Sequence, residues 1–257
     1  MSAYEGKFVW YELMTSDARA AEAFYAAAIG WQAKDAGMPG QSYTLFSAGP
    51  AMVGGLMGLP QDARARGVGP CWTGYVAVAD VDAMARRVTD AGGSVHRAPD
   101  DIPGIGRFAV VADPQGAVFM LFRGQGEPPP APPGPGVPGH VGWHELHTTD
   151  REAGFAFYAG LFGWTRSEAV DMGPMGIYQT WAAAGPAIGG MFTKGPGMPG
   201  PFWLFYFNVA AIDAAIARVA QAGGKVAHGP MQVPGGSWIA QCFDPQGAMF
   251  AMVAPQR

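Results

Sequence analysis

Apolar and polar positions along the chain follow two periods, one typical of strands and one typical of helices. Residues 8–15, FVWYELMT, alternate aromatic and apolar side chains with few breakers, which predicts a β-strand. Asp17 then precedes residues 18–28, where apolar side chains recur at helical spacing, and Gly30 follows them. Asp is a preferred N-cap residue and Gly commonly follows the last helical residue, so both ends of this helix are marked.

Six further strands and a second helix complete the first half of the chain. The Gly54–Gly55 pair in one of these strands indicates a bulge or a close backbone approach. Asp80 caps the second predicted helix, and the turn DPQG separates the last two strands. We interpret the half as strand–helix–three strands, twice over. The predicted elements lie at residues 42–49, 51–58, 71–79, 80–91 (the helix), 94–99, 107–113 and 117–123.

The second half of the chain repeats the first. Residues 7–31, KFVWYELMTSDARAAEAFYAAAIGW, match residues 140–164, HVGWHELHTTDREAGFAFYAGLFGW. VGGLM, DAGG and ADPQGAVFML then have the counterparts IGGMF, QAGG and FDPQGAMFAM in the same order. Similarity over the whole length indicates duplication of an entire domain. We therefore predict an α+β fold with two tandem domains, residues 1–123 and 140–257.

A stretch rich in proline and glycine, GQGEPPPAPPGPGVPG at residues 124–139, separates the two copies. Proline fixes φ and lacks a backbone donor, so this stretch does not fit inside a helix or a sheet. We predict an extended, semi-rigid linker. A recognition site for a proline-binding partner is the less favoured alternative.

Composition limits the classes of function. Of the 257 residues 49% are apolar and 14% charged, and the net charge is −4. Such a chain can form packed cores but lacks the clustered positive charge that nucleic acid requires. The apolar run MFAMVA is too short to span a bilayer, and the first residues do not resemble a secretory signal. Two cysteines are too few for a disulfide framework, so we expect a cytoplasmic protein. From the charge and the apolar runs we expect neither nucleic-acid nor membrane partners.

The order βαβββ–βαβββ, with its FY…GW helix motif and DPQG turn, resembles the vicinal oxygen chelate superfamily. This superfamily includes glyoxalases, extradiol dioxygenases and bleomycin-resistance proteins. The resemblance covers nearly the whole chain except the linker. It implies that each domain is a pair of βαβββ modules forming a half-open eight-stranded barrel around a divalent metal.

The resemblance also places the metal ligands of the superfamily on this sequence. None of the side chains at those positions is an imidazole, thiolate or carboxylate, the donors that zinc, iron and manganese use. The GGLM and GGMF segments add no donor. We therefore predict that no metal is bound, with zinc, manganese or iron at a displaced site as the alternative. The positions are Trp10, Thr73, Met120, Trp143, Leu204 and Ala251.

Carboxylates are the remaining candidates for chemistry. Strand side chains alternate between two faces, so Glu12 shares a face with Trp10, and Glu145 and His147 share a face with Trp143. A buried carboxylate must be hydrogen-bonded, paired or neutralised. The two glutamates either contact substrate or act as a general base, or they cap backbone N–H groups or pair with arginine. Glu145 and His147 form a candidate acid–base pair, or two of the three donors that a metal needs.

Large apolar side chains in the predicted strands are candidates for contacting substrate. A cavity with aromatic walls and one polar anchor suits a planar organic ligand, whereas ordinary core packing explains most of these side chains equally well. The predicted substrate-binding residues are Trp10, Met14, Trp72, Met120, Trp143 and Trp203.

These patterns favour a protein that binds a small hydrophobic or aromatic molecule in its barrel cavities without a metal. The alternative is a metal-dependent lyase or dioxygenase with a displaced site in the C-terminal domain, and a third is an interaction scaffold. Whether the protein is an enzyme stays open. The expected partners are a small organic ligand and, within the chain, the other domain; a homodimer also stays open.

Overall fold

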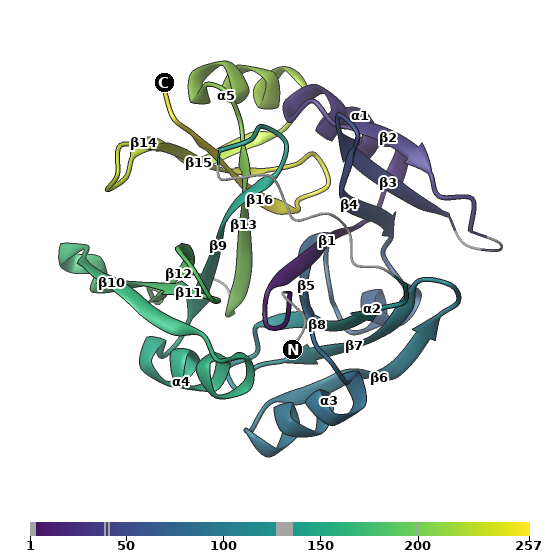
Figure 1. The fold of residues 1–257 in the computed structure, drawn as a ribbon. Helices are drawn as coiled ribbons and strands as arrows, with labels where there is room; N and C mark the ends of the chain where they lie inside the picture. Colours follow the sequence, from purple (N-terminus) through teal and green to yellow (C-terminus); the bar gives the residue numbers. More distant parts are fainter. Residues whose placement is uncertain (1–3, 39, 41, 127–135, 199) are drawn as a thin grey trace. The chain divides into compact units, whose positions relative to one another are not determined.

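The computed structural model describes residues 4–38, 40, 42–126, 136–198 and 200–257 (Figure 1). Two eight-stranded mixed sheets with helices make up these residues, one in each half of the sequence. Each sheet has two edge strands and stays open across the part of the chain that is described. This confirms the predicted α+β class and the tandem repeat of half-open sheets.

The first half contains one sheet in the order β2-β3-β4-β1-β5-β8-β7-β6. The short helix α2 and the strand β2 have no counterpart among the elements predicted at stated residues. The elements are β1 (Phe8–Thr15), α1 (Ala18–Ala28), β2 (Gln32–Asp35), β3 (Tyr43–Ala48), β4 (Ala51–Gly58), α2 (Gln61–Ala65), β5 (Cys71–Ala77), α3 (Val81–Asp90), β6 (Ser94–Ile102), β7 (Gly106–Ala112) and β8 (Val118–Gly124).

The second half repeats this order as β10-β11-β12-β9-β13-β16-β15-β14. In both halves the first strand pairs in parallel with the fourth and the fifth in parallel with the eighth. The elements are β9 (Val141–Thr148), α4 (Arg151–Phe162), β10 (Thr165–Asp171), the 3₁₀ turn η1 (Gly173–Met175), β11 (Ile177–Ala182), β12 (Ala187–Thr193), β13 (Phe202–Asn208), α5 (Ile212–Gln221), β14 (Lys225–Gln232), β15 (Trp238–Phe243) and β16 (Met249–Ala254).

The predicted helix starts are observed. Asp17, Asp80 and Asp150 are N-caps, and each side chain accepts a hydrogen bond from the backbone N–H three residues later. Such a bond satisfies one of the donors that a helix start leaves open. None of the described helices is both long enough and apolar enough to cross a membrane.

Contacts divide the chain into two compact units, which we call unit I and unit II. Each combines one βαβββ module from the first half of the sequence with one from the second. Unit I comprises the described parts of Met1–Val9, Thr73–Ala131 and His144–Trp203, and unit II those of Trp10–Trp72, Pro132–Trp143 and Leu204–Arg257. The predicted boundaries at 123 and 140 mark the duplication and stay a prediction; residues 127–135 of the predicted linker lie outside the described residues.

The core of unit I contains a chain of three hydrogen-bonded side chains. Trp203 Nε1 donates to the Tyr158 hydroxyl at 3.1 Å, and that hydroxyl donates to Asp113 Oδ2 at 3.1 Å. Trp164 stacks on the Tyr158 ring with centroids 5.1 Å apart, and Phe119 packs against it at 5.5 Å. Burial raises the pKa of Tyr158 and of Asp113. The buried polar groups are therefore hydrogen-bonded to one another.

Unit II is built in the same way with the halves exchanged. Trp72 Nε1 donates to the Tyr25 hydroxyl at 2.8 Å, which donates to Asp244 Oδ2 at 3.2 Å. Trp31 stacks on Tyr25 at 5.6 Å, and Phe250 packs against it at 5.4 Å. In each unit the FY…GW helix motif of one half thus bonds the DPQG turn of the other half. These motifs carried the family resemblance, and here they act in the core.

Candidate functional site

The candidate site of the second half lies in unit I, on β9, β11 and β12. The Tyr178 hydroxyl donates to Glu145 Oε2 at 2.9 Å. Glu145 is opposite Gly190 in the β9–β12 register, and the Tyr178 ring occupies the space where a side chain on Gly190 would stand. A Cβ added at Gly190 would lie 2.1 Å from Tyr178 Cε1. The glycine therefore lets the tyrosine cross the intervening strand to reach the glutamate.

His147 completes this arrangement, which we call the second-half site. Its Nε2 lies 2.8 Å from Glu145 Oε1, so the two carboxylate oxygens contact two different side chains. The His147 ring is 1% exposed; it stacks on Phe202 at 4.3 Å and meets Phe192 at 4.6 Å. The structure therefore brings together Glu145 and His147, the pair that the sequence singled out.

The first-half site lies in unit II and has a glycine, a tyrosine and a glutamate at the equivalent positions. Tyr43 hydrogen-bonds Glu12 and accepts a 3.0 Å hydrogen bond from Trp10 Nε1. A Cβ on Gly55, which is opposite Glu12, would lie 1.9 Å from the Tyr43 hydroxyl oxygen. Burial, and then the charge of Glu12, raise the pKa of Tyr43. Glu12 is itself 5% exposed, and its partner Tyr43 is half-buried.

The two sites differ at the next position on the strand. Met14 takes the place of His147, and it is opposite Met57 in the β1–β4 register, where the second half has His147 opposite Phe192. Met14 and Met57 are half-buried. The first-half site therefore carries flexible thioethers where the second-half site carries an imidazole between aromatic rings.

The tyrosines of both sites are missing from the sequence prediction, although the sequence carried a signal for them. Tyr43 precedes Gly55, and Tyr178 precedes Gly190, by the same number of residues, so the tyrosine is part of the duplicated pattern. Both parts of the prediction for the double glycine are confirmed, because the β3–β4 register shifts between Phe46 and Ser47, beside Gly54, and both glycines lie at close approaches. The second glycine accommodates the tyrosine, and the first, Gly54, leaves room for the Tyr11 carbonyl 2.9 Å from its ideal Cβ.

The other predicted substrate-binding residues have different surroundings. Trp72 and Trp203 are buried in the aromatic cores beside Tyr25 and Tyr158. Met120 is 4% exposed and lies opposite Tyr75 across β5 and β8. These contacts favour the core-packing interpretation for all three, and their contact with substrate stays a prediction. Trp143 is half-buried near the start of β9.

The metal of the superfamily does not fit the residues present. At the first-strand position, the only polar atom of the Trp10 side chain already donates to Tyr43. At the strand-eight position of the second half, Ala251 offers no donor atom at all. Among the described residues no three His, Cys, Asp or Glu side chains come together to hold a metal ion. Glu145 and His147 supply two donors, fewer than a metal site uses. That no metal is bound stays a prediction.

His144, next to the second-half site in sequence, belongs to the core of unit I. Its ring stacks on Phe8 with centroids 4.7 Å apart, and its Nδ1 lies 2.7 Å from the Ile188 carbonyl oxygen. Burial lowers the pKa of His144 to about 4. This histidine is therefore neutral near pH 7 and serves packing.

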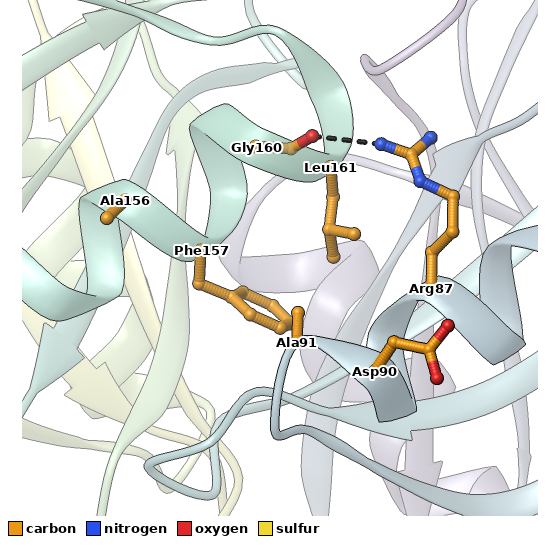
Figure 2. A pocket seen from close by; sticks show the side chains of 7 residues that line it. All are labelled: Arg87, Asp90, Ala91, Ala156, Phe157, Gly160 and Leu161. Atoms are coloured by element: carbon orange, nitrogen blue, oxygen red, sulfur yellow. Dashed lines mark hydrogen bonds between the residues drawn. The ribbon is translucent and has the colours of Figure 1, made fainter.

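An open pocket of about 350 Å³ lies between α3 and α4 of unit I (Figure 2). Arg87 crosses it and donates from Nη2 to the Gly160 carbonyl oxygen at 2.9 Å. No residue of the second-half site lines it. The pocket is therefore a groove between two packed helices, with the lining residues Arg87, Asp90, Ala91, Ala156, Phe157, Gly160 and Leu161.

Comparison with known proteins identifies one family along both halves. A family model described as "Glyoxalase/Bleomycin resistance protein/Dioxygenase superfamily" matches residues 7–121 and again residues 138–252. The chain is similar to "Anthracycline biosynthesis protein DauV" of Streptomyces sp. (strain C5), at 34% identity over 96% of this chain and 93% of that protein. It is also similar to "Putative glyoxylase CFP32" of Mycobacterium bovis, at 33% identity over 96% of this chain and 94% of that protein.

Among solved structures, the Mn(II)-bound glyoxalase from Novosphingobium aromaticivorans has the same fold. Its TM-score is 0.67 at 18% identity, with 98% of this chain and 83% of that chain covered. At this identity the likeness concerns the fold alone.

Proposed function

Because the chain belongs to the glyoxalase/bleomycin resistance protein/dioxygenase superfamily, we propose that it binds a small hydrophobic or aromatic molecule at each of its two glutamate–tyrosine sites, without a metal. The observation that carries this proposal is the hydrogen-bonded pair Glu145–Tyr178 and its counterpart Glu12–Tyr43. These pairs occur in both halves, whereas the ligand positions of the superfamily carry no suitable donors.

The chemistry of the pair selects a ligand with a hydroxyl group. Each carboxylate oxygen has two acceptor positions, so Glu145 can accept a further hydrogen bond while it keeps Tyr178. The tyrosine oxygen can also accept a hydrogen bond from a ligand. Phe192 and Phe202 beside Glu145 and His147 provide apolar rings for stacking. A planar, hydroxylated aromatic molecule matches this combination.

The similarity to a protein named for anthracycline biosynthesis supports the same ligand class, because anthracyclines are flat, hydroxylated ring systems. A hydroxylated anthraquinone such as alizarin is therefore a suitable probe. The residues support the proposal independently of that name, through a carboxylate–tyrosine pair at each site and aromatic rings beside the second-half pair.

The test is a titration with alizarin, in the presence of a chelator, followed by quenching of tryptophan fluorescence. We expect saturable binding to the wild-type protein. Glu12→Gln and Glu145→Gln should each weaken one class of site about 10- to 100-fold, since a hydrogen bond to a charged group contributes about 1.5–3 kcal/mol. Glu168→Gln, a change at an exposed residue of β10, is the matched control. Equal affinity of the double variant and the wild type would contradict the proposal.

Elemental analysis after incubation with zinc, manganese and ferrous iron, followed by desalting, tests the metal-dependent alternative. The contact between Glu145 and His147 is the one observation that favours it. Retained metal that is lost in His147→Ala would establish a displaced centre in the second half. Absence of retained metal, together with alizarin binding, would favour the proposed function.

A further inference from the structure

Beside the glutamate of the first-half site, three side chains lie in a row across neighbouring strands. Tyr43 is opposite Met57 in the β3–β4 register, and Met57 is opposite Met14 in the β1–β4 register. Side chains that are opposite one another on paired strands project from the same face of the sheet. These three residues, which we call the first-half row, therefore form one continuous surface with a flexible thioether in the middle.

The equivalent second-half row has an aromatic ring at every position. Phe192 is opposite His147 in the β9–β12 register. Its ring stacks on Tyr178 with centroids 6.0 Å apart and an angle of 29° between the planes, and it meets the His147 ring at 4.6 Å. Phe192 thus takes the place that Met57 has in the first half. The middle of the row is a ring in one site and a thioether in the other.

A ligand can reach the middle of each row. Tyr178 and Phe192 are half-buried, and so are Tyr43 and Met57. Part of each of these side chains is therefore exposed beside the glutamate that is proposed to hold the hydroxyl group of the ligand. His147 is 1% exposed, so it packs against Phe192 without contacting the ligand.

An aromatic ring and a thioether select different ligands. A ring presents its face and its edge to a flat aromatic molecule, and such a pair contributes more than the buried area alone. A saturated ring is puckered and has no π electrons, so it gains no such contribution. A methionine side chain rotates about three bonds and adapts to either shape.

We propose that Phe192 makes the second-half site selective for flat aromatic alcohols, and that Met57 lets the first-half site take saturated ring alcohols as well. The inference rests on the proposed function, because Glu145 and Glu12 hold the hydroxyl group in both sites. The duplicated sites therefore bind two ligand classes, phenols in the second half and a wider class of phenols and cyclic alcohols in the first.

Two probes of nearly the same outline test this selectivity, 2-naphthol and its fully saturated form, decahydro-2-naphthol. Each carries one hydroxyl group on two fused rings, but only 2-naphthol is flat and aromatic. Glu12→Gln weakens the first-half site and Glu145→Gln the second, so isothermal titration calorimetry of these two proteins follows one site at a time. The readout is the ratio of the two dissociation constants. Comparing this ratio between proteins cancels the difference in hydrophobicity between the probes.

Exchanging the middle residues should exchange the preferences. Adding Phe192→Met to the Glu12→Gln protein should lower the preference for 2-naphthol about 2- to 10-fold, the contribution of one aromatic pair. Adding Met57→Phe to the Glu145→Gln protein should raise that preference by a similar factor. Met52→Phe is the matched control, because Met52 lies on the same strand but is 63% exposed and is opposite Ser47, outside the row. It should leave the ratio unchanged.

The outcomes separate this inference from the proposed function. Binding of both probes with an unchanged ratio in Phe192→Met and in Met57→Phe would overturn the inference and leave the binding proposal intact. Urea unfolding checks that each variant is folded, and Met57→Phe decides the question if Phe192→Met does not fold. Failure of the wild type to bind either probe or alizarin would contradict the proposed function itself.

Discussion

The two sites compare closely in geometry and differ in chemistry. Glu12 pairs with Tyr43 and Glu145 pairs with Tyr178. In each half the tyrosine reaches the glutamate across an equivalent glycine. The position two residues further along the strand is Met14 in one half and His147 in the other. The shared part requires three residues on neighbouring strands to fit one another, whereas the differing part is a single side chain beside them. Duplication thus gives two copies of the glutamate–tyrosine arrangement, and the residue beside it can differ between the copies.

The cores of units I and II, by contrast, do not differ in chemistry. Each contains the same series of three hydrogen-bonded side chains. Trp203–Tyr158–Asp113 and Trp72–Tyr25–Asp244 have the same order of donors and acceptors. Each chain joins residues from both halves of the sequence. A change in either half would leave a buried group of the other half without its partner, which explains why the two chains stay alike.

The largest effect is expected from breaking one of these chains. Tyr158→Phe leaves Trp203 Nε1 and Asp113 Oδ2 without the partner shown here, at roughly 1–3 kcal/mol for each group. Tyr25→Phe should lower the free energy of unfolding by a similar amount in unit II. Urea unfolding followed by circular dichroism measures both. A loss below about 0.5 kcal/mol is the usual size for a surface substitution. It would show that these hydrogen-bonded side chains contribute little to the free energy of unfolding.

The next effect concerns acid stability, where the halves should differ. His144 is buried with a pKa of about 4, below the 6.5 of an exposed histidine, and Tyr11 occupies the equivalent position of the first half. The unfolded chain binds a proton between these values and the folded protein does not. Stability present above pH 6.5 is therefore lost as the pH falls towards 4, by about 3 kcal/mol.

His144→Phe removes this titration and should flatten the dependence of unfolding free energy on pH between 4 and 6.5. Tyr11→Phe is the matched change in the first half and should leave the slope as it is in the wild type. Urea unfolding at a series of pH values is the measurement. An unchanged slope in His144→Phe would mean that other groups account for the acid sensitivity.

The smallest effect is expected at the glycines that accommodate the tyrosines. Gly190→Ala and Gly55→Ala each place a Cβ against a tyrosine, which should cost about 1–3 kcal/mol of stability through overpacking and weaken alizarin binding. Gly160→Ala on α4 is the control, since nothing lies within 4 Å of its ideal Cβ. It should be neutral or stabilising. Unchanged alizarin binding in both site variants would show that the tyrosines do not contribute to binding the ligand.

Several features were predictable from the sequence because they depend on residues close together along the chain. Periodicity predicts β1 and α1, Asp17 and Asp80 mark helix starts, and recurring motifs reveal the duplication. Alternation along β9 also puts Glu145 and His147 on one face, and the structure shows them in contact. These conclusions follow from local geometry, in which side-chain direction repeats with the residue number.

The tertiary structure alone decides which residues meet from distant segments. Trp72 and Trp203 are predicted from the sequence to contact substrate, and the tertiary structure shows that they donate to buried tyrosines on α1 and α4. Tyr43 and Tyr178 become site residues only because strands pair so that a glycine lies between tyrosine and glutamate. The sequence by itself thus determines the elements, the repeat and the side-chain alternation. Strand pairing and packing decide the partners, because burial requires each polar group to find a hydrogen bond wherever the chain folds back.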